Sequence, residues 1–418
     1  MVWNDPIEQV LASQTSTRSR GLRRCLWAAS GLLLTLLVWG GYRLWVDSQA
    51  AGYAAACEAA RQRRAWPEVE RDAVAWARWA PRQGRAWQYA AEAARRQGQP
   101  ARAAEHLSRV PEDAVEATAA LMDLSDLQFN ELNRPLDGER TCRRVLAADP
   151  RNAEAHRRLV FFYTVTLQRA KLIQQARAAI RLDCAVPEIY IYLMSADWLT
   201  LTNAKDLIEY WLQADPENEH FLVARAVHFL GTQGVLGEVA DVDPQGKPLP
   251  QRPEVAATQR RLDEYLLRFP KNLEVLAYAV NQACVGGDRQ RVASLLAQAP
   301  EEAQDDNRFW RSKGWLHAAQ DEYSEAEAAY RQALTLHPYD LQSQHELASV
   351  LRRLQRYAEV NVLEQRALLG MKFRRDIFAL PNVKSAPKIL LTKLVAYARD
   401  CGDAEFADHL MRRTSNLP

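Results

Sequence analysis

The chain has 418 residues, of which 54 are Lys or Arg and 52 are Asp or Glu, so its formal net charge is only +2. This balance is that of an ordinary protein surface, and it excludes a field over the whole molecule that would attract nucleic acid. Ala, Leu, Arg, Gln and Glu, which lose little side-chain freedom in a helix, dominate the sequence and favour an all-α fold.

The first predicted element is a transmembrane helix over residues 25–46. Residues 25–42 carry no charge, and an apolar run of about 20 residues is long enough to cross a bilayer. Trp27 near one end and Trp45 near the other match the interfacial position of aromatic side chains in such helices. A secretory signal peptide cleaved near Ala50 is the alternative, although its apolar region would be shorter.

Charge asymmetry around this segment predicts its orientation. Four arginines lie within residues 18–24, whereas the other flank opens with Arg43 and Asp47. The positive-inside rule therefore makes residues 1–24 a cytoplasmic tail and places the rest of the chain across the membrane. We expect a single-pass protein of a bacterial inner (plasma) membrane with an exported domain.

Helices follow at about 50–64, 67–79, 84–97 and 100–109, separated by turns that contain Pro or Gly. Their faces are rich in Ala and Trp. Small residues let helices approach closely, and large aromatic rings fill the facing holes. The sequence therefore predicts a packing role for four tryptophans, namely Trp66, Trp76, Trp79 and Trp87.

A recurring four-residue sequence with Pro at its second position divides the next part of the chain. It reads DPRN at 149–152, DPEN at 215–218, FPKN at 269–272 and HPYD at 337–340. Pro cannot continue the preceding helix, and the Asn or Asp two residues later can cap the next one. APRQ at 80–83 is a weaker version without the capping residue. The recurrence predicts helical hairpins repeated along the chain.

The window 307–340 carries the clearest repeat. Its marker residues, in chain order, are Trp310, Gly314, Tyr323, Ala326, Tyr330, Ala333 and Pro338. This order resembles the tetratricopeptide repeat, in which an early Trp and a Gly precede A-x3-F/Y, an Ala and a closing Pro. Lys313 and His317 depart from the pattern, because Leu and Tyr usually occupy those positions. The resemblance implies a right-handed superhelical solenoid of tetratricopeptide-like hairpins over residues 50–370.

Two segments interrupt the repeated pattern of helices. Residues 231–253 contain four Gly and four Pro and are inserted between the two helices of one repeat. Insertions of this kind map to one face of a repeat protein, which is often the binding face. The other segment, residues 371–418, is predicted to be a linker followed by a hairpin at 388–400 and 403–413 that caps the open end of the array.

The sequence carries no motif for catalysis, cofactor binding or metal binding. His345-Glu346 begins the H-E-x-x-H pattern of zinc proteases, but position 349 is Ser, so the second ligand is missing. The six cysteines include no C-x-x-C pair and are expected as small buried residues at helix contacts. No phosphate-binding glycine loop and no nucleophile elbow occurs. We therefore expect no catalytic residue, no cofactor and no metal, and we predict that the chain is not an enzyme.

The resemblance implies a concave groove, lined mainly by the first helix of each repeat, that holds a peptide or protein segment. Polar and aromatic positions on the predicted first helices supply the candidate contact residues. They are Arg157, Tyr163, Trp310, Lys313, His317, Gln344 and Arg352.

The function predicted from these features is that of a membrane-anchored scaffold or adaptor with a protein or peptide partner. In layout the chain resembles single-anchor tetratricopeptide proteins that work with secretion or envelope-assembly machinery, and proteins of cytochrome c maturation share that layout. Two alternatives remain open. One is a non-catalytic docking subunit of a membrane enzyme or envelope-assembly complex. The other is a structural scaffold that associates with itself as a homo-oligomer. Nucleic acid is not expected as a partner, because the Arg pairs have Asp or Glu nearby.

Overall fold

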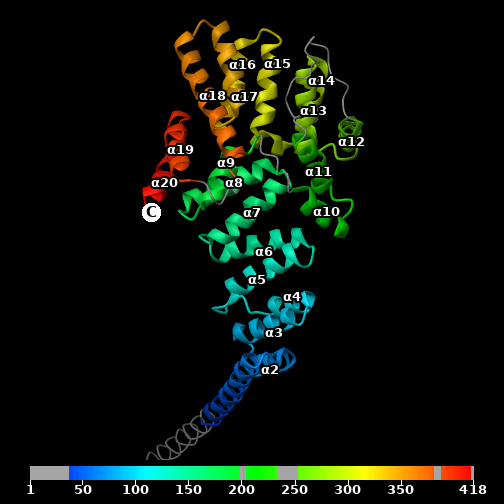
Figure 1. The fold of residues 1–418 in the computed structure, drawn as a ribbon, viewed down its shortest axis with the longest axis vertical. Helices are drawn as coiled ribbons and strands as arrows, with labels where there is room; N and C mark the ends of the chain where they lie inside the picture. Colours follow the sequence, from blue (N-terminus) through cyan, green and yellow to red (C-terminus); the bar gives the residue numbers. More distant parts are fainter. Residues whose placement is uncertain (1–36, 198–200, 202–203, 233–252, 381–386, 416–418) are drawn as a thin grey trace, which may run out of the picture. The chain divides into compact units, whose positions relative to one another are not determined.

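The structure is a computed structural model, and it describes residues 37–197, 201, 204–232, 253–380 and 387–415. Within these ranges all regular structure is helical, which confirms the predicted all-α class (Figure 1). The chain divides into two compact units, Met1–Leu124 (unit 1) and Ser125–Pro418 (unit 2).

The helix bounds follow the predicted hairpins closely. In unit 1 a helix over residues 37–62 is followed by α2 (Trp66–Trp79), α3 (Gly84–Arg96) and α4 (Pro100–Ser108). The unit boundary falls within α5 (Ala117–Asn130). Unit 2 continues with α6 (Pro135–Ala148), α7 (Ala153–Val165), α8 (Arg169–Arg181), α9 (Pro187–Met194), α10 (Ala204–Ala214), α11 (Glu219–Thr232), α12 (Pro253–Arg268), α13 (Leu273–Val285), α14 (Arg289–Ala297), the short 3-10 helix η1 (Glu301–Asp305), α15 (Asn307–Ala318), α16 (Tyr323–Leu336), α17 (Leu341–Arg353), α18 (Tyr357–Phe378), α19 (Lys388–Asp400) and α20 (Ala404–Ser415).

The turn inside each hairpin recurs in backbone detail. Two positions before the second helix, one residue adopts a positive φ of 54° to 80°, and the residues that do so are Arg64, Gly98, Asn133, Leu167, Gly287, Asp321, Gln355 and Gly402. The following N–H group then reaches a carbonyl five residues back, as from Gln168 to Tyr163 at 2.9 Å and from Glu322 to His317 at 2.9 Å. This is the Schellman arrangement that ends a helix. Its repetition shows that the hairpin is the repeating unit.

The turns between hairpins are capped as the sequence predicts. The side-chain oxygen of each expected capping residue accepts a hydrogen bond from a backbone N–H group in the first turn of the next helix. The bonds are Asn152 with Ala155 at 3.0 Å, Asn218 with Phe221 at 3.2 Å, Asn272 with Val275 at 3.2 Å and Asp340 with Ser343 at 3.0 Å. Gln83, in the weaker APRQ sequence, makes no side-chain capping bond. All these predictions are confirmed.

The α15–α16 hairpin shows why the tetratricopeptide pattern needs its small and large residues. Gly314 of α15 faces the ring of Tyr330 on α16, and a Cβ atom at position 314 would lie 2.8 Å from that ring. Tyr330 and Ala326 are both buried. A glycine on the first helix therefore admits the aromatic residue of the second, and the hairpin is tetratricopeptide-like in its packing as well as in its sequence.

Unit 1 is held together by small residues and aromatic rings. Ala73, Ala77, Ala86 and Ala90 are buried around Trp76, whose indole N–H donates to Gln83 Oε1 at 2.9 Å. Alanines at these positions let the helices approach closely, so one tryptophan fills the remaining space. Trp79 and Trp87 are partly buried and pack against this cluster, and Trp66 packs against a second cluster of Ala60, Val69 and Ala93, which confirms the predicted packing role.

Unit 2 is organised around the α8–α9 region. α9 is buried along nearly its whole length, from Glu188 to Met194, as expected of a helix that is apolar on all sides. The C-terminal helix α20 packs against this region, because Phe406 lies edge-on to Tyr190 at 5.5 Å and Asp403 pairs with Arg177 of α8 at 2.6 Å. Helices more than 200 positions apart in the sequence are thus side by side.

Two expectations for the C-terminal segment need correction. The last repeat does not end at position 370, because α18 continues without a break through Gly370 to Phe378. The final hairpin α19–α20 also does more than cap the end of the array, since α20 is bound to α8 and α9. The physical reason is the apolar α9, which needs cover that adjacent repeats alone do not supply.

Among the described residues no helix is both long and apolar enough to span a membrane. Residues 25–36 of the predicted transmembrane segment lie outside the described ranges, as does the tail 1–24. Residues 37–46 are helical, and Leu37, Trp39 and Leu44 in this stretch are exposed. Of the predicted insertion 231–253, residues 233–252 likewise lie outside the described ranges, whereas residues 231–232 and 253 belong to α11 and α12.

Candidate functional site

Two of the sequence-predicted contact residues are core residues. Tyr163 is 2% exposed, and its hydroxyl group donates to Glu139 at 2.8 Å and accepts from Arg143 at 3.0 Å. Gln344 has no exposed surface, and its amide donates to the carbonyl of Pro338 at 2.8 Å. Neither side chain can reach a partner, so both predictions were wrong. Helical periodicity assigns each residue to a helix face but does not show which face the fold covers.

Three predicted residues lie together along α15. The ammonium group of Lys313 lies 4.1 Å from the centre of the Trp310 ring, and the Trp310 indole donates to the carbonyl of Gln304 at 2.9 Å. His317, one turn further on, pairs with Glu322 at 2.6 Å. Each of these groups is therefore satisfied locally.

Arg352 is exposed near the end of α17. It pairs with Glu364 of α18 and donates to Ser349 at 3.4 Å. The structure shows no contact between Arg352 and any of the other predicted residues in the described part of the chain.

Arg157 is the predicted residue that lies at a cleft. The cleft opens between α5, α7 and α10 in unit 2 and has a volume of about 160 Å³. Its lining residues are Asp126, Phe129, Asn130, Arg157, Arg158, Phe161, Phe162, Leu207 and Trp211. We call it the α7 cleft. Phe161 is 37% exposed, whereas Phe162 and Trp211 are buried, so the cleft combines an apolar floor with an aromatic residue at its mouth.

The charged rim of the α7 cleft is balanced internally. Arg157 binds Glu154 through Nε at 2.6 Å, and Arg158 binds the same carboxylate at 2.8 Å and the Ser125 hydroxyl at 2.6 Å. Burial raises the pKa of Glu154, but the hydrogen bonds from the two arginines outweigh it and leave the pKa below its usual value. The rim can therefore orient a polar backbone, but it does not call for a strongly charged ligand.

The α7 cleft was only partly visible in the sequence. The run Arg157-Arg158-Leu-Val-Phe161-Phe162 places two arginines and two phenylalanines on one predicted first helix, and this run was the available signal. Leu207 and Trp211 belong to α10, and no local pattern connects them to α7. Their contribution depends on how the hairpins fold together, which is why they were missed.

Unit 1 has a second, wider cleft of about 450 Å³. Its lining residues are Ala54, Glu58, Trp76, Gln83, Arg85, Tyr89 and Glu116. The Tyr89 hydroxyl donates to Glu58 at 2.7 Å and accepts from Arg85 at 3.3 Å. Its polar groups are thus bonded to one another, and its floor contains fewer aromatic residues than that of the α7 cleft.

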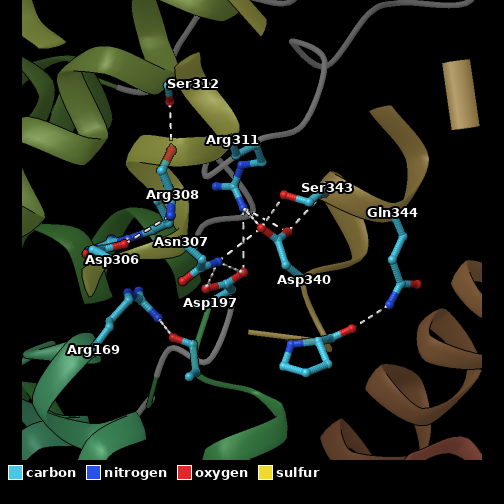
Figure 2. A network of polar contacts seen from close by, with 12 residues as sticks. Arg169, Asp197, Asp306, Asn307, Arg308, Arg311, Ser312, Asp340, Ser343 and Gln344 are labelled. Carbon is cyan, nitrogen blue, oxygen red and sulfur yellow. Dashed lines mark hydrogen bonds and ion pairs between the residues drawn. The ribbon is translucent and has the colours of Figure 1, made fainter. Parts of the chain in front are cut away.

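A buried ionic network stabilises unit 2 (Figure 2). Arg308 of α15 pairs with Glu274 of α13 at 2.5 Å and with Asp306 at 2.7 Å, and Arg169 of α8 pairs with Glu274 at 3.1 Å. Burial raises the pKa of the Glu274 carboxyl, but Arg169 and Arg308 outweigh it, so the pKa lies below its usual value. The N-termini of α13 and α15 are fixed on α8 in this way.

The second half of the network attaches α17. Arg311 pairs with Asp340, the capping residue of α17, at 2.8 Å, and Asn307 bridges Asp340 at 3.0 Å and Asp197 at 2.9 Å. Burial and the neighbouring charge of Asp340 raise the pKa of Asp197. These groups are closely packed and bonded to one another, so the network positions helices and offers no space for a ligand. In the described ranges no group of three or more His, Cys, Asp or Glu residues could hold a metal ion.

The packing and the turns define an all-α helical-repeat protein with tetratricopeptide-like hairpins. No protein-family model matches the sequence. No curated protein matches it either.

Three solved structures show limited similarity to this chain. A human IFIT1 dimer with m7Gppp-AAAA is 14% identical at a TM-score of 0.31, covering 86% of this chain and 75% of that one. Cut9–Hcn1 of the APC/C is 11% identical at a TM-score of 0.31, covering 88% and 78%. Yeast Tom70 is 12% identical at a TM-score of 0.25, covering 88% and 85%. Similarities at this level carry no argument about partners or function.

Proposed function

We propose that this chain is a non-catalytic protein-binding scaffold, held at a membrane by residues 25–46, whose repeat region binds a segment of a partner protein. The observation that carries the proposal is the α7 cleft, which has an apolar aromatic floor, a charge-balanced rim and an opening to the surface. The anchor rests on the charge-free run 25–42 and the arginines before it.

The size and chemistry of the cleft favour a peptide side chain over a small molecule. Pockets for drug-sized ligands usually have volumes of about 300–1,000 Å³. The α7 cleft, at about 160 Å³, has room for one large apolar side chain beside Phe161 and Leu207. Aromatic and arginine residues of this kind are enriched where protein interfaces gain most of their affinity. The Arg157 and Asn130 side chains at the rim can then orient the backbone of the bound segment.

The repeat architecture supports the same proposal. Hairpins that stack in series expose long surfaces without any active-site constellation, and such surfaces serve mainly in recognition. The charged side chains of the α7 cleft are bonded to one another rather than poised for proton transfer. A binding role is therefore the one that the geometry supports best.

The test is site-specific crosslinking in native cells with a photoreactive residue at position 130 of the full chain, because Asn130 is exposed at the rim of the α7 cleft. We expect a small, reproducible set of partner proteins, which is lost when Phe161→Glu places a charge at the mouth of the cleft. Val285→Glu is the matched control, since Val285 is 72% exposed on α13 and lies outside the cleft. If Phe161→Glu and Val285→Glu retained the same partners, binding would have to occur elsewhere. Crosslinks to copies of the same chain alone would support the self-associating alternative.

The anchor is tested by removing residues 1–46. We expect the full chain to remain with the membrane fraction after alkaline extraction and the truncated chain to leave it. A truncated chain that stayed membrane-bound under these conditions would contradict the proposed anchor.

A further inference from the structure

The outward face of α18 is unusually apolar for an exposed helix surface. α18 is 22 residues long, whereas the preceding α16 and α17 have 14 and 13. Along its C-terminal half Leu368 is 62% exposed, Leu369 41% and Met371 52%. Single exposed apolar residues are common on any surface, but Leu368 and Met371, three positions apart, share one side of α18 with Leu369 beside them, and exposed apolar residues grouped in this way mark a site of interaction.

The repeat architecture explains what such a face is shaped to bind. In the array the next helix covers the exposed side of each pair, as α17 covers α16 by burying Tyr330 and Leu347 in one cluster. The inner side of α18 is used in the same way, since Val360 and Leu363 are buried against α17. Figure 1 shows α18 as the outermost of the helices α15 to α18. Its outward side therefore has the form that a further helix would complete.

The final hairpin does not occupy that place. α19 packs on another side of α18, where Tyr397 faces Gly370 and its ring lies 5.1 Å from the Phe373 ring. α20 is held instead on α8, through the pair of Asp403 with Arg177. Leu368 and Leu369 therefore stay exposed, although a hairpin follows α18 in the sequence.

Positive charge accompanies the apolar residues. Lys372 and Arg375 follow Leu368 at i+4 and i+7, which places all three on one side of the helix. Both are exposed, and neither pairs with a carboxylate in the described part of the chain. Residues 366–376 contain four basic residues and only Asp376 as an acid. A partner that covers this face must therefore supply both apolar side chains and carboxylates.

We propose that the outward face of α18 docks an acidic amphipathic helix of a partner protein. Leucines of the partner pack on Leu368, Leu369 and Met371, while its Asp or Glu residues pair with Lys372 and Arg375. A second copy of this chain is a poor occupant of the same face, because a two-fold contact would bring like charges together. This surface is built from other residues than the α7 cleft and stands independently of it.

The test uses the full-length chain in detergent and a displayed library of amphipathic helices of about 20 residues, whose polar faces are acidic, neutral or basic. We expect acidic helices to be enriched and their affinity to fall at least about tenfold in the double variant Leu369→Ser/Lys372→Glu. The matched control is Leu267→Ser/Lys271→Glu, which makes the same changes at exposed residues near α12 and should leave binding unchanged. Phe161→Glu at the α7 cleft should leave it unchanged as well.

Four results would overturn the proposal. The first is a library from which no helix is enriched, and the second is enrichment of neutral or basic helices. The third is equal binding by the Leu369→Ser/Lys372→Glu variant. In the fourth, acidic helices still bind the variant, but the variant no longer forms a dimer seen by light scattering or no longer binds vesicles with anionic lipid. The face would then serve self-association or a lipid surface.

Discussion

Unit 1 and unit 2 are built from the same kind of hairpin but are held together differently. In unit 1 the core consists largely of alanines around Trp76, and the buried Glu70 pairs with His106 only 36 positions away. In unit 2 the buried Arg169 pairs with Glu274 at a separation of 105 positions, and Arg177 pairs with Asp403 at 226.

The difference shows how distant hairpins of a repeat array are joined to one another. Neighbour packing through small residues suffices for stacking, and stability is then roughly the sum of local terms. Ion pairs across distant hairpins link the parts of unit 2 into one cooperative block. We therefore expect unit 1 to respond to changes in packing volume and unit 2 to respond to changes in charge.

The largest effect is expected when a buried charge of unit 2 is removed. Arg308→Ala leaves Asp306 buried without its paired cation and Glu274 with Arg169 alone, which should cost about 3–5 kcal/mol of unfolding free energy. Arg61→Ala is the counterpart in unit 1, where the Arg61–Glu92 pair is exposed, and it should cost less than about 1 kcal/mol. Both losses of unfolding free energy are measured by urea unfolding, with amide hydrogen exchange followed separately in each unit. Equal losses from the two substitutions would show that the buried network is not the stabilising element.

The next effect is a dependence on pH in unit 2. Burial lowers the pKa of His228 to about 4, below its usual value of about 6.5. Between these values the unfolded chain binds a proton that the folded chain does not. The stabilisation is therefore complete above about pH 6.5 and is lost as the pH falls toward 4, by about 3 kcal/mol.

His228→Gln tests this prediction. Gln retains a donor for the carbonyl of Val165 and an acceptor for the Leu201 N–H group, but it does not titrate. Unfolding free energies at pH 7.5 and pH 4.5 should therefore differ less in His228→Gln than in the natural chain. An unchanged pH dependence would show that His228 is not a source of the acid sensitivity.

A smaller effect is expected from added volume in unit 1. Ala90 has no exposed surface, so Ala90→Leu should strain the contact with Trp76 and cost about 1–3 kcal/mol. Ala358→Leu on α18 of unit 2 is the control, because Ala358 is exposed and the larger side chain meets solvent. Thermal unfolding of the two variants gives the comparison. A tolerated Ala90→Leu would mean that the alanine core of unit 1 is loosely packed.

The smallest effect concerns the hairpin turns, where the two units use different residues at the same backbone position. Gly98 in unit 1 has φ of +72° and Gln355 in unit 2 has φ of +59°. Gly98→Ala should destabilise its turn by about 1 kcal/mol, whereas Gln355→Gly should stabilise its turn by up to about 1 kcal/mol. Opposite shifts in midpoint temperature are the expected outcome. Shifts of the same sign would mean that side-chain contacts outweigh the backbone preference.

Much of the fold could be predicted from local signals. The helices that follow the Pro-containing four-residue sequences are capped as predicted, because Pro and a short polar side chain act on adjacent backbone groups. The capping residues are Asn152, Asn218, Asn272 and Asp340. The candidate site could be predicted only in part. Arg157 lies at the α7 cleft, whereas Tyr163 and Gln344 are buried, since periodicity does not show how deeply a helix face is covered.

The sequence by itself therefore determined the helices, their caps, their pairing into hairpins and the glycine that admits Tyr330, all of which depend on residues close together in the chain or on one hairpin. The tertiary structure alone decided that α20 lies on α8, that Glu274 meets both Arg169 and Arg308, and that Trp211 completes the α7 cleft. The physical reason is that these contacts satisfy buried charge and apolar surface across long separations, and any of several charged or apolar residues could have served as the partner. Only the complete packing of unit 2 selects among them.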